Sequence, residues 1–93
     1  MVIVEVATVK LFGNLREVAG APHFEVPGEK VGDLLQALCV GNEALRAAIF
    51  DGAILRPFVR VMLNGQDIEL AQGLNTQVSD SSSIAIFPPI AGG

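Results

Sequence analysis

Residues 30–42 carry the clearest amphipathic helix pattern in the chain, and this pattern constrains the fold most. Its apolar side chains recur at the spacing of a single helical face: Val31, Leu34, Leu35, Leu38 and Cys39. The segments on both sides are instead rich in β-branched residues, as strands are. A single amphipathic helix can cover only one face of a sheet. We therefore expect an α+β fold with its helices on one side.

Strand patterns account for most of the other apolar residues. β-branched residues dominate 2–12, a short strand-like run occupies 24–26, and a last one occupies 83–87. Asn64-Gly65 separates two further β-rich runs and is the strongest short-range signal for a hairpin. The chain is therefore expected to form two strands, the main helix, a hairpin and a final strand.

Polar residues and glycines mark the ends of the expected helices. Asn14 is placed to cap a short helix that ends at Gly20. Gly41 is placed to cap the main helix, and Asn42 to begin another short helix over 43–50. The inward positions of the two short helices are Leu15, Val18, Ala19, Leu45 and Ile49.

This order of elements is typical of the β-grasp fold, a mixed sheet of about five strands with one main helix packed on one face. In that arrangement the first and last strands are parallel neighbours in the middle of the sheet. A chain of 93 residues is too short for two separate cores. We predict one β-grasp domain over residues 1–87, followed by a flexible C-terminal tail over 88–93.

Side-chain parity in the expected strands predicts a patch on the sheet face away from the helix. Phe12 and Phe87 end the first and last strands and point away from the buried side. Arg60 and Met62 of the hairpin share this face, and Lys10 precedes Phe12 by two positions. The residues on the buried side are Val9, Leu11, Ile84 and Ile86. We expect a docking patch with a basic fringe; the alternative is that each side chain simply packs along the sheet.

Composition argues against several classes of function. The net charge is −4, with six basic residues that are not clustered, so nucleic acid is not expected as a partner. Glu5 and Lys10 interrupt the apolar start, which favours a strand over a signal peptide or a membrane helix. We expect a cytoplasmic protein with no membrane partner.

The histidine and the cysteine are weak candidates for chemistry. His23 follows Pro22 in an expected loop, with no second ligand at a metal-binding spacing, so no metal site is expected. Cys39 lies on the apolar stripe of the main helix, so we expect a buried structural thiol.

Three segments together resemble the MoaD family, the ubiquitin-like sulfur carriers that serve as small subunits of molybdopterin synthase. They are "FGNLREVAG" at 12–20, "LRPFVRVMLNGQDI" at 55–68 and "FPPIAGG" at 87–93. The resemblance runs from about Val9 to Gly93, with the C-terminal motif its most specific part. One departure is "SDSSS" at 79–83, where the family commonly has an acidic turn that contains glycine.

The resemblance implies partners as well as a fold. It implies that the carboxyl group of Gly93 becomes a thiocarboxylate, and that the chain itself binds no cofactor. ATP would be used by an adenylating partner of the ubiquitin-activating type, similar to MoeB. The other partners that the resemblance implies are a sulfur donor and a large catalytic subunit of the MoaE type.

The composition of the tail suits entry into the active site of another enzyme. Pro88 and Pro89 favour a stiff extended segment. Ala91, Gly92 and Gly93 are small enough to pass through a narrow channel. We predict Gly93, with Gly92 beside it, as the group that carries the chemistry. The predicted partner contacts are Phe12, Met62, Arg60, Phe87, Pro88, Pro89, Ile90 and Ala91.

Several functions stay open at this point. In the first, the chain is the sulfur-donating subunit of molybdopterin synthase, and the catalytic side chains belong to its partners. The same activated glycine can instead be transferred to lysines of other proteins, as in a ubiquitin-like modifier, or deliver sulfur to thiamin or tRNA. A β-grasp interaction domain with an inert tail is the remaining alternative. The "FPP" of the terminal motif favours the molybdopterin branch, by resemblance.

Overall fold

The computed structural model describes residues 6–79 and 82–89. The strands are β1 (Val6–Leu11), β2 (His23–Pro27), β3 (Phe50–Asp51), β4 (Ile54–Leu55), β5 (Arg60–Leu63), β6 (Gln66–Asp67) and β7 (Ser83–Phe87). The α-helices are α1 (Leu15–Ala19), α2 (Val31–Leu38) and α3 (Glu43–Ile49), and two short 3₁₀ helices are η1 (Ile68–Leu70) and η2 (Gly73–Asn75). None of the helices within these two ranges has the length and apolar character needed to cross a membrane.

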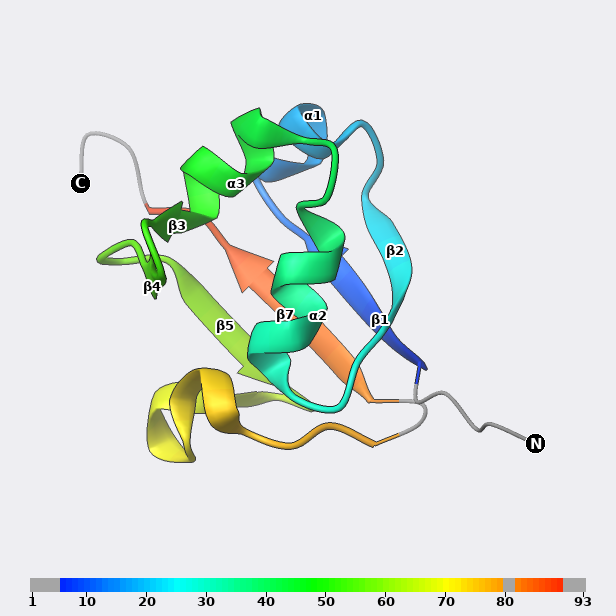
Figure 1. Ribbon diagram of the computed structural model, residues 1–93, viewed down its shortest axis with the longest axis vertical. Helices are drawn as coiled ribbons and strands as arrows, with labels where there is room; N and C mark the ends of the chain where they lie inside the picture. Colours follow the sequence, from blue (N-terminus) through cyan, green and yellow to red (C-terminus); the bar gives the residue numbers. More distant parts are fainter. Residues whose placement is uncertain (1–5, 80–81, 90–93) are drawn as a thin grey trace.

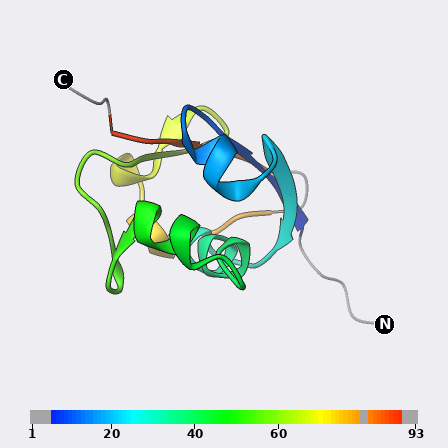
Figure 2. The same ribbon diagram turned by 90° about the horizontal axis from the view of Figure 1, so that it is seen from above.

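The main sheet has the strand order β2-β1-β7-β5-β6. Its two central strands, β1 and β7, are parallel, whereas the other pairs are antiparallel. Figure 1 shows α2 crossing one face of this sheet, and Figure 2 shows α2 and α3 on the same side of it. The predicted β-grasp fold is therefore confirmed, including the parallel pair in the middle of the sheet.

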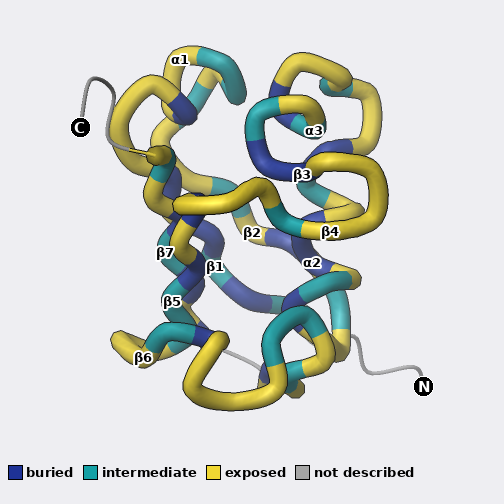
Figure 3. Tube along the Cα trace, turned by 90° about the vertical axis from the view of Figure 1, so that its left-hand side faces the viewer, coloured by how far each residue is buried: buried dark blue, intermediate teal, exposed yellow. Residues whose placement is uncertain are grey.

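The core lies between this sheet and α2. Alternate residues of β1 and β7 are buried, as the period-2 geometry of a strand requires. These residues are Val9, Leu11, Ile84 and Ile86, and they meet Val31, Leu34 and Leu35 of α2 in one apolar cluster. Figure 3 shows buried stretches in the middle of β1, β7 and α2. Within the described part of the chain, no helix covers the opposite face of the sheet, and the predicted patch lies there.

The hairpin forms at Asn64-Gly65, as predicted. Both residues have positive φ, 50° and 87°, which is the conformation that this residue pair adopts in tight hairpins. The Asn64 side chain also accepts a hydrogen bond from the backbone N–H of Ser83 at 2.9 Å. The turn therefore anchors the hairpin to the start of β7 and sets the register of β5 against it.

Helix α1 begins directly after Asn14 and ends at Gly20, as expected, but Asn14 does not cap it with its side chain. The Gly20 N–H donates to the Arg16 carbonyl with φ at 86°, so this glycine closes the helix. Asn14 makes no capping hydrogen bond with its side chain, because its own backbone is already helical. The prediction of a side-chain cap at Asn14 is wrong.

The predicted ends of α2 and α3 were wrong by one or two residues, whereas the predicted cap at the start of α3 is confirmed. Asn42 caps α3, since its side chain accepts from the Leu45 N–H at 3.0 Å. Gly41 does not cap α2: the helix ends at Leu38 with tightened hydrogen bonds, and Gly41 lies in the following turn with φ at 78°. Phe50 belongs to β3 instead of α3, because it pairs with β4.

A candidate docking surface at the root of the tail

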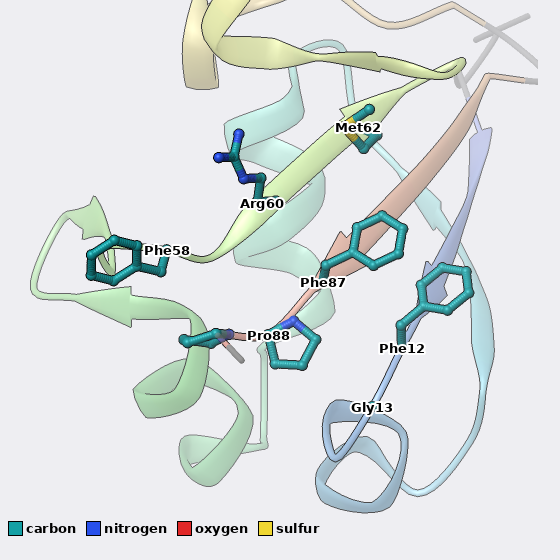
Figure 4. A pocket seen from close by; sticks show the side chains of 8 residues that line it. Phe12, Gly13, Phe58, Arg60, Met62, Phe87 and Pro88 are labelled. Atoms are coloured by element: carbon teal, nitrogen blue, oxygen red, sulfur yellow. The ribbon is translucent and has the colours of Figure 1, made fainter. Parts of the chain in front are cut away.

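A groove of about 970 Å³ lies on the sheet face opposite α2, at the carboxyl ends of β1 and β7. We call it the open-face groove. Figure 4 shows its side chains in front of the sheet, with α2 behind. The groove is lined by Phe12, Gly13, Phe58, Arg60, Met62, Phe87, Pro88 and Pro89.

The parallel pairing of β1 and β7 brings Phe12 and Phe87 together. Their rings stack with centroids 4.5 Å apart and an interplanar angle of 11°. The Phe12 N–H donates to the Ile86 carbonyl at 3.1 Å, so the two strand ends are tied by their backbones as well. Both residues remain more than one third exposed, at 37% and 36%. The structure places an aromatic pair on the open face, at positions that parity predicted; its role in binding stays a prediction.

Arg60 and Met62 reach the same face because β5 pairs with β7. Arg60 lies opposite Phe87 in the register, and Met62 lies opposite Ala85. Arg60 Nη1 donates to Asp67 Oδ2 at 2.9 Å, which holds this exposed guanidinium at the rim of the groove. The groove is thus an apolar floor with one basic group at its rim.

Asp67 has a lowered pKa. The first cause is the Glu69 backbone N–H, which donates to Asp67 Oδ1 at 2.9 Å; the Arg60 guanidinium adds to it, while burial opposes it. A carboxyl whose pKa is lower in the folded state binds its proton less tightly there than in the unfolded chain. It therefore stabilises the fold above its unfolded pKa of about 3.9, and this stabilisation is lost as the pH falls through the folded pKa.

Asp67→Asn is expected to lower the free energy of unfolding by about 1 kcal/mol near neutral pH. The difference from the unsubstituted chain should disappear in strong acid, where Asp67 is protonated in both states. Urea unfolding followed by circular dichroism across the acid range measures this. Asp51→Asn, at an exposed position in β3, is the control. A difference that persists unchanged to the lowest pH would contradict the assignment to the charged carboxylate.

Two lining residues of the groove were not predicted. Phe58 shares the parity of Arg60 and Met62, so the signal was present in the sequence. Phe58 is 81% exposed, and its φ of 71° is unusual for a residue other than glycine. Gly13 gave no signal in the sequence, because its part in the groove comes from a tertiary contact with Pro88.

Of the other predicted residues, the two prolines lie at the groove, Lys10 lies apart from it, and the rest of the tail lies outside the described residues. Lys10 is exposed in β1 but does not line the groove. Pro88 is half-buried and Pro89 exposed, both at the groove. Ile90, Ala91, Gly92 and Gly93 lie outside the described residues.

His23 and Cys39 do not contribute to this surface. His23 is exposed, but it begins β2 and pairs with Lys10, so its predicted place in a loop is wrong. Cys39 is fully buried, as predicted. Burial raises the pKa of its thiol, with Arg46 lowering it and Glu43 raising it to smaller extents. Among residues 6–79 and 82–89, no three His, Cys, Asp or Glu side chains gather as a metal site.

The chain is similar to known proteins over almost its whole length. Residues 9–93 match the family model described as the ThiS family. Small archaeal modifier protein 1 of Haloferax volcanii is 36% identical over 88 residues, which cover 90% of this chain and 97% of that protein. The chain is therefore similar to ubiquitin-like proteins of the ThiS family in general, and these matches do not single out the MoaD family.

Solved structures agree with the fold. The solution structure of small archaeal modifier protein 1 from Methanosarcina acetivorans matches with a TM-score of 0.89 and 38% identity, covering 99% of this chain and 100% of that one. A chain in the crystal structure of the Amycolatopsis orientalis BexX/CysO complex matches with a TM-score of 0.84 and 26% identity, covering 94% and 99%.

Proposed function

The chain belongs to the ThiS family, and from this premise we propose that it is a covalent carrier activated at Gly93. The family match carries the proposal, and the position of the groove supports it. The family match extends through Gly93, and β7 leads directly from the open-face groove into Pro88 and Pro89 at the root of the tail. A docked partner would hold the body of the domain while the tail enters its active site.

The chemistry needs no side chain of this protein. A carboxylate oxygen of Gly93 attacks the α-phosphorus of ATP, the bond to the β-phosphate breaks, and pyrophosphate leaves. The resulting acyl-adenylate is a reactive acyl donor. Hydrosulfide, or a sulfur donor that supplies its equivalent, then adds to the acyl carbon and displaces AMP, which leaves a thiocarboxylate on Gly93. ATP is bound by the adenylating partner throughout.

The open-face groove is the proposed docking surface for that adenylating partner, an enzyme of the ubiquitin-activating type similar to MoeB. Its apolar floor, with the stacked Phe12 and Phe87, would bury against apolar side chains of the partner. Arg60, held at the rim by Asp67, would face an acidic side chain.

Two acceptors for the activated group follow from different observations. The terminal "FPPIAGG" resembles the MoaD family, which supports sulfur transfer within molybdopterin synthase to the active site of a MoaE-type large subunit. The likeness to small archaeal modifier protein 1, at 38% identity and a TM-score of 0.89, supports attachment to lysines of other proteins. Both routes begin with the same adenylate.

Intact-mass spectrometry tests the shared first steps. The chain is incubated with ATP, sulfide and an adenylating enzyme of the ubiquitin-activating type from the same genome. The expected result is a mass increase equal to the exchange of one oxygen for one sulfur, located at Gly93 by fragmentation. An unchanged mass, with an enzyme that charges another carrier in parallel, contradicts the proposal. If the chain is charged, an isopeptide bond between the Gly93 carboxyl group and lysines of other proteins in cells would identify the modifier route.

A further inference from the structure

We propose that Gly13 is a positioning residue that sets the direction in which the C-terminal tail leaves the domain. The inference rests on the proposed function, because its consequence is the placement of Gly93 for adenylation. Gly13 belongs to the turn between β1 and α1, and Pro88 is the first residue after β7. The two segments meet at the open-face groove (Figure 4).

The contact between these two residues leaves no room for a side chain at position 13. A Cβ atom on Gly13 would lie 2.8 Å from Pro88 Cγ and 3.4 Å from Pro88 Cδ. Ordinary contacts of a Cβ atom begin at about 3.4 Å, so one of the two segments would have to move. Gly13 also has φ at 61°, which glycine adopts freely and residues with a side chain rarely do.

Neither segment can yield easily. On the side of Gly13, the turn is held by hydrogen bonds from the Leu15 N–H to the Phe12 carbonyl and from the Arg16 N–H to the Gly13 carbonyl, both at 3.3 Å. Leu15 is buried in the core, which anchors the turn further.

On the side of the tail, the ring of Pro88 is joined to its own backbone. A displacement of Cγ larger than a change of ring pucker can absorb therefore moves the chain, because no side-chain rotation is available. Phe87, directly before it, is held by its stack on Phe12 and by pairing with Arg60. The displacement therefore falls on the chain from Pro88 onward, which continues to Gly93. A side chain at position 13 would therefore redirect the tail at Pro88, while the stacked Phe12 and Phe87 keep the apolar floor of the groove in place.

Gly13→Ala is expected to lower the rate constant of adenylation about tenfold, because small misplacements of a reacting group are costly. The substrate concentration at half-maximal rate should stay within about twofold, since it reports docking of the domain. Pyrophosphate release with the adenylating enzyme measures both quantities.

Gly52→Ala is the matched control. Gly52 has φ at 64°, close to that of Gly13, and its Cβ would meet nothing within 4 Å. Any effect of backbone strain alone is therefore shared by both variants, whereas contact with Pro88 is not. Gly13→Asn and Gly52→Asn repeat the comparison with a residue that adopts positive φ more readily than alanine. This second pair keeps the test valid if Gly13→Ala folds poorly.

A Pro88→Ala background isolates the contact, since it removes the two ring atoms that the new Cβ would meet. In that background, Gly13→Ala should slow adenylation no more than Gly52→Ala does. An equal effect of both glycine substitutions in the unsubstituted chain overturns the inference while the proposed function stands. An equally large effect of Gly13→Ala with and without the Pro88 ring also overturns it. No charging of the unsubstituted chain overturns the proposed function and, with it, this role of Gly13.

Discussion

Addition of one alanine after Gly93 is expected to abolish formation of the thiocarboxylate. The extra residue moves the reacting carboxylate by about 3.4 Å along an extended chain. It also places a methyl group where the proposed channel admits only glycine. A reacting group misplaced by this much should react at least about 100-fold more slowly. Intact-mass spectrometry after incubation with ATP, sulfide and the adenylating enzyme measures the charged fraction.

The control for this prediction carries the same alanine before Met1, at the other end of the chain. It should charge as the unmodified protein does. If the variant extended at Gly93 charges equally well, the terminal carboxylate is not the site of chemistry. The chain would then be a β-grasp interaction domain whose tail takes no part in the reaction.

Phe87→Ala is expected to weaken binding to the adenylating enzyme by about 30-fold, the effect of losing a residue worth about 2 kcal/mol at an interface. Phe87 lies between the stacked ring of Phe12 and the cross-strand neighbour Arg60, and it lines the groove that we propose for docking. Its removal takes away apolar contact and frees the ring of Phe12. Isothermal titration calorimetry without ATP measures the dissociation constant separately from the chemistry.

Ile54→Ala is the control for docking. Ile54 is also an exposed large apolar residue, at 65%, but it lies in β4 and does not line the groove. Its substitution should leave the dissociation constant within about twofold. Thermal unfolding of both variants shows whether a loss of binding comes from a loss of folded protein. Equal affinity of Phe87→Ala and the unsubstituted chain would place the docking surface elsewhere on the domain.

Much of the open-face groove could be predicted because two regular elements meet there. Side chains alternate along a strand with a period of two, so the buried Ile86 implies that Phe87 points to the other face. The parallel pairing of β1 and β7, expected from the order of elements, then puts Phe12 beside Phe87. Arg60 and Met62 follow by the same parity once β5 pairs with β7.

Irregular segments were predicted less well. Phe58 precedes β5 with a positive φ, so strand parity indicated its face but not its part in the groove. His23 was expected in a loop because Pro22 precedes it, yet backbone pairing with Lys10 extends β2 to include it. Asn14 was expected to cap α1 with its side chain. Its backbone is already helical, with φ at −69° and ψ at −12°, whereas a capping residue needs an extended backbone.

The sequence alone was sufficient for the fold class, the parallel central pair and the Asn64-Gly65 hairpin. Each of these depends on local conformational preference, on the periodicity of one element or on the order of the elements along the chain. Only the tertiary structure decided that Gly13 contacts Pro88, since a contact across 75 residues depends on how two separate chain segments pack. That packing decides where the domain ends and in which direction its tail begins.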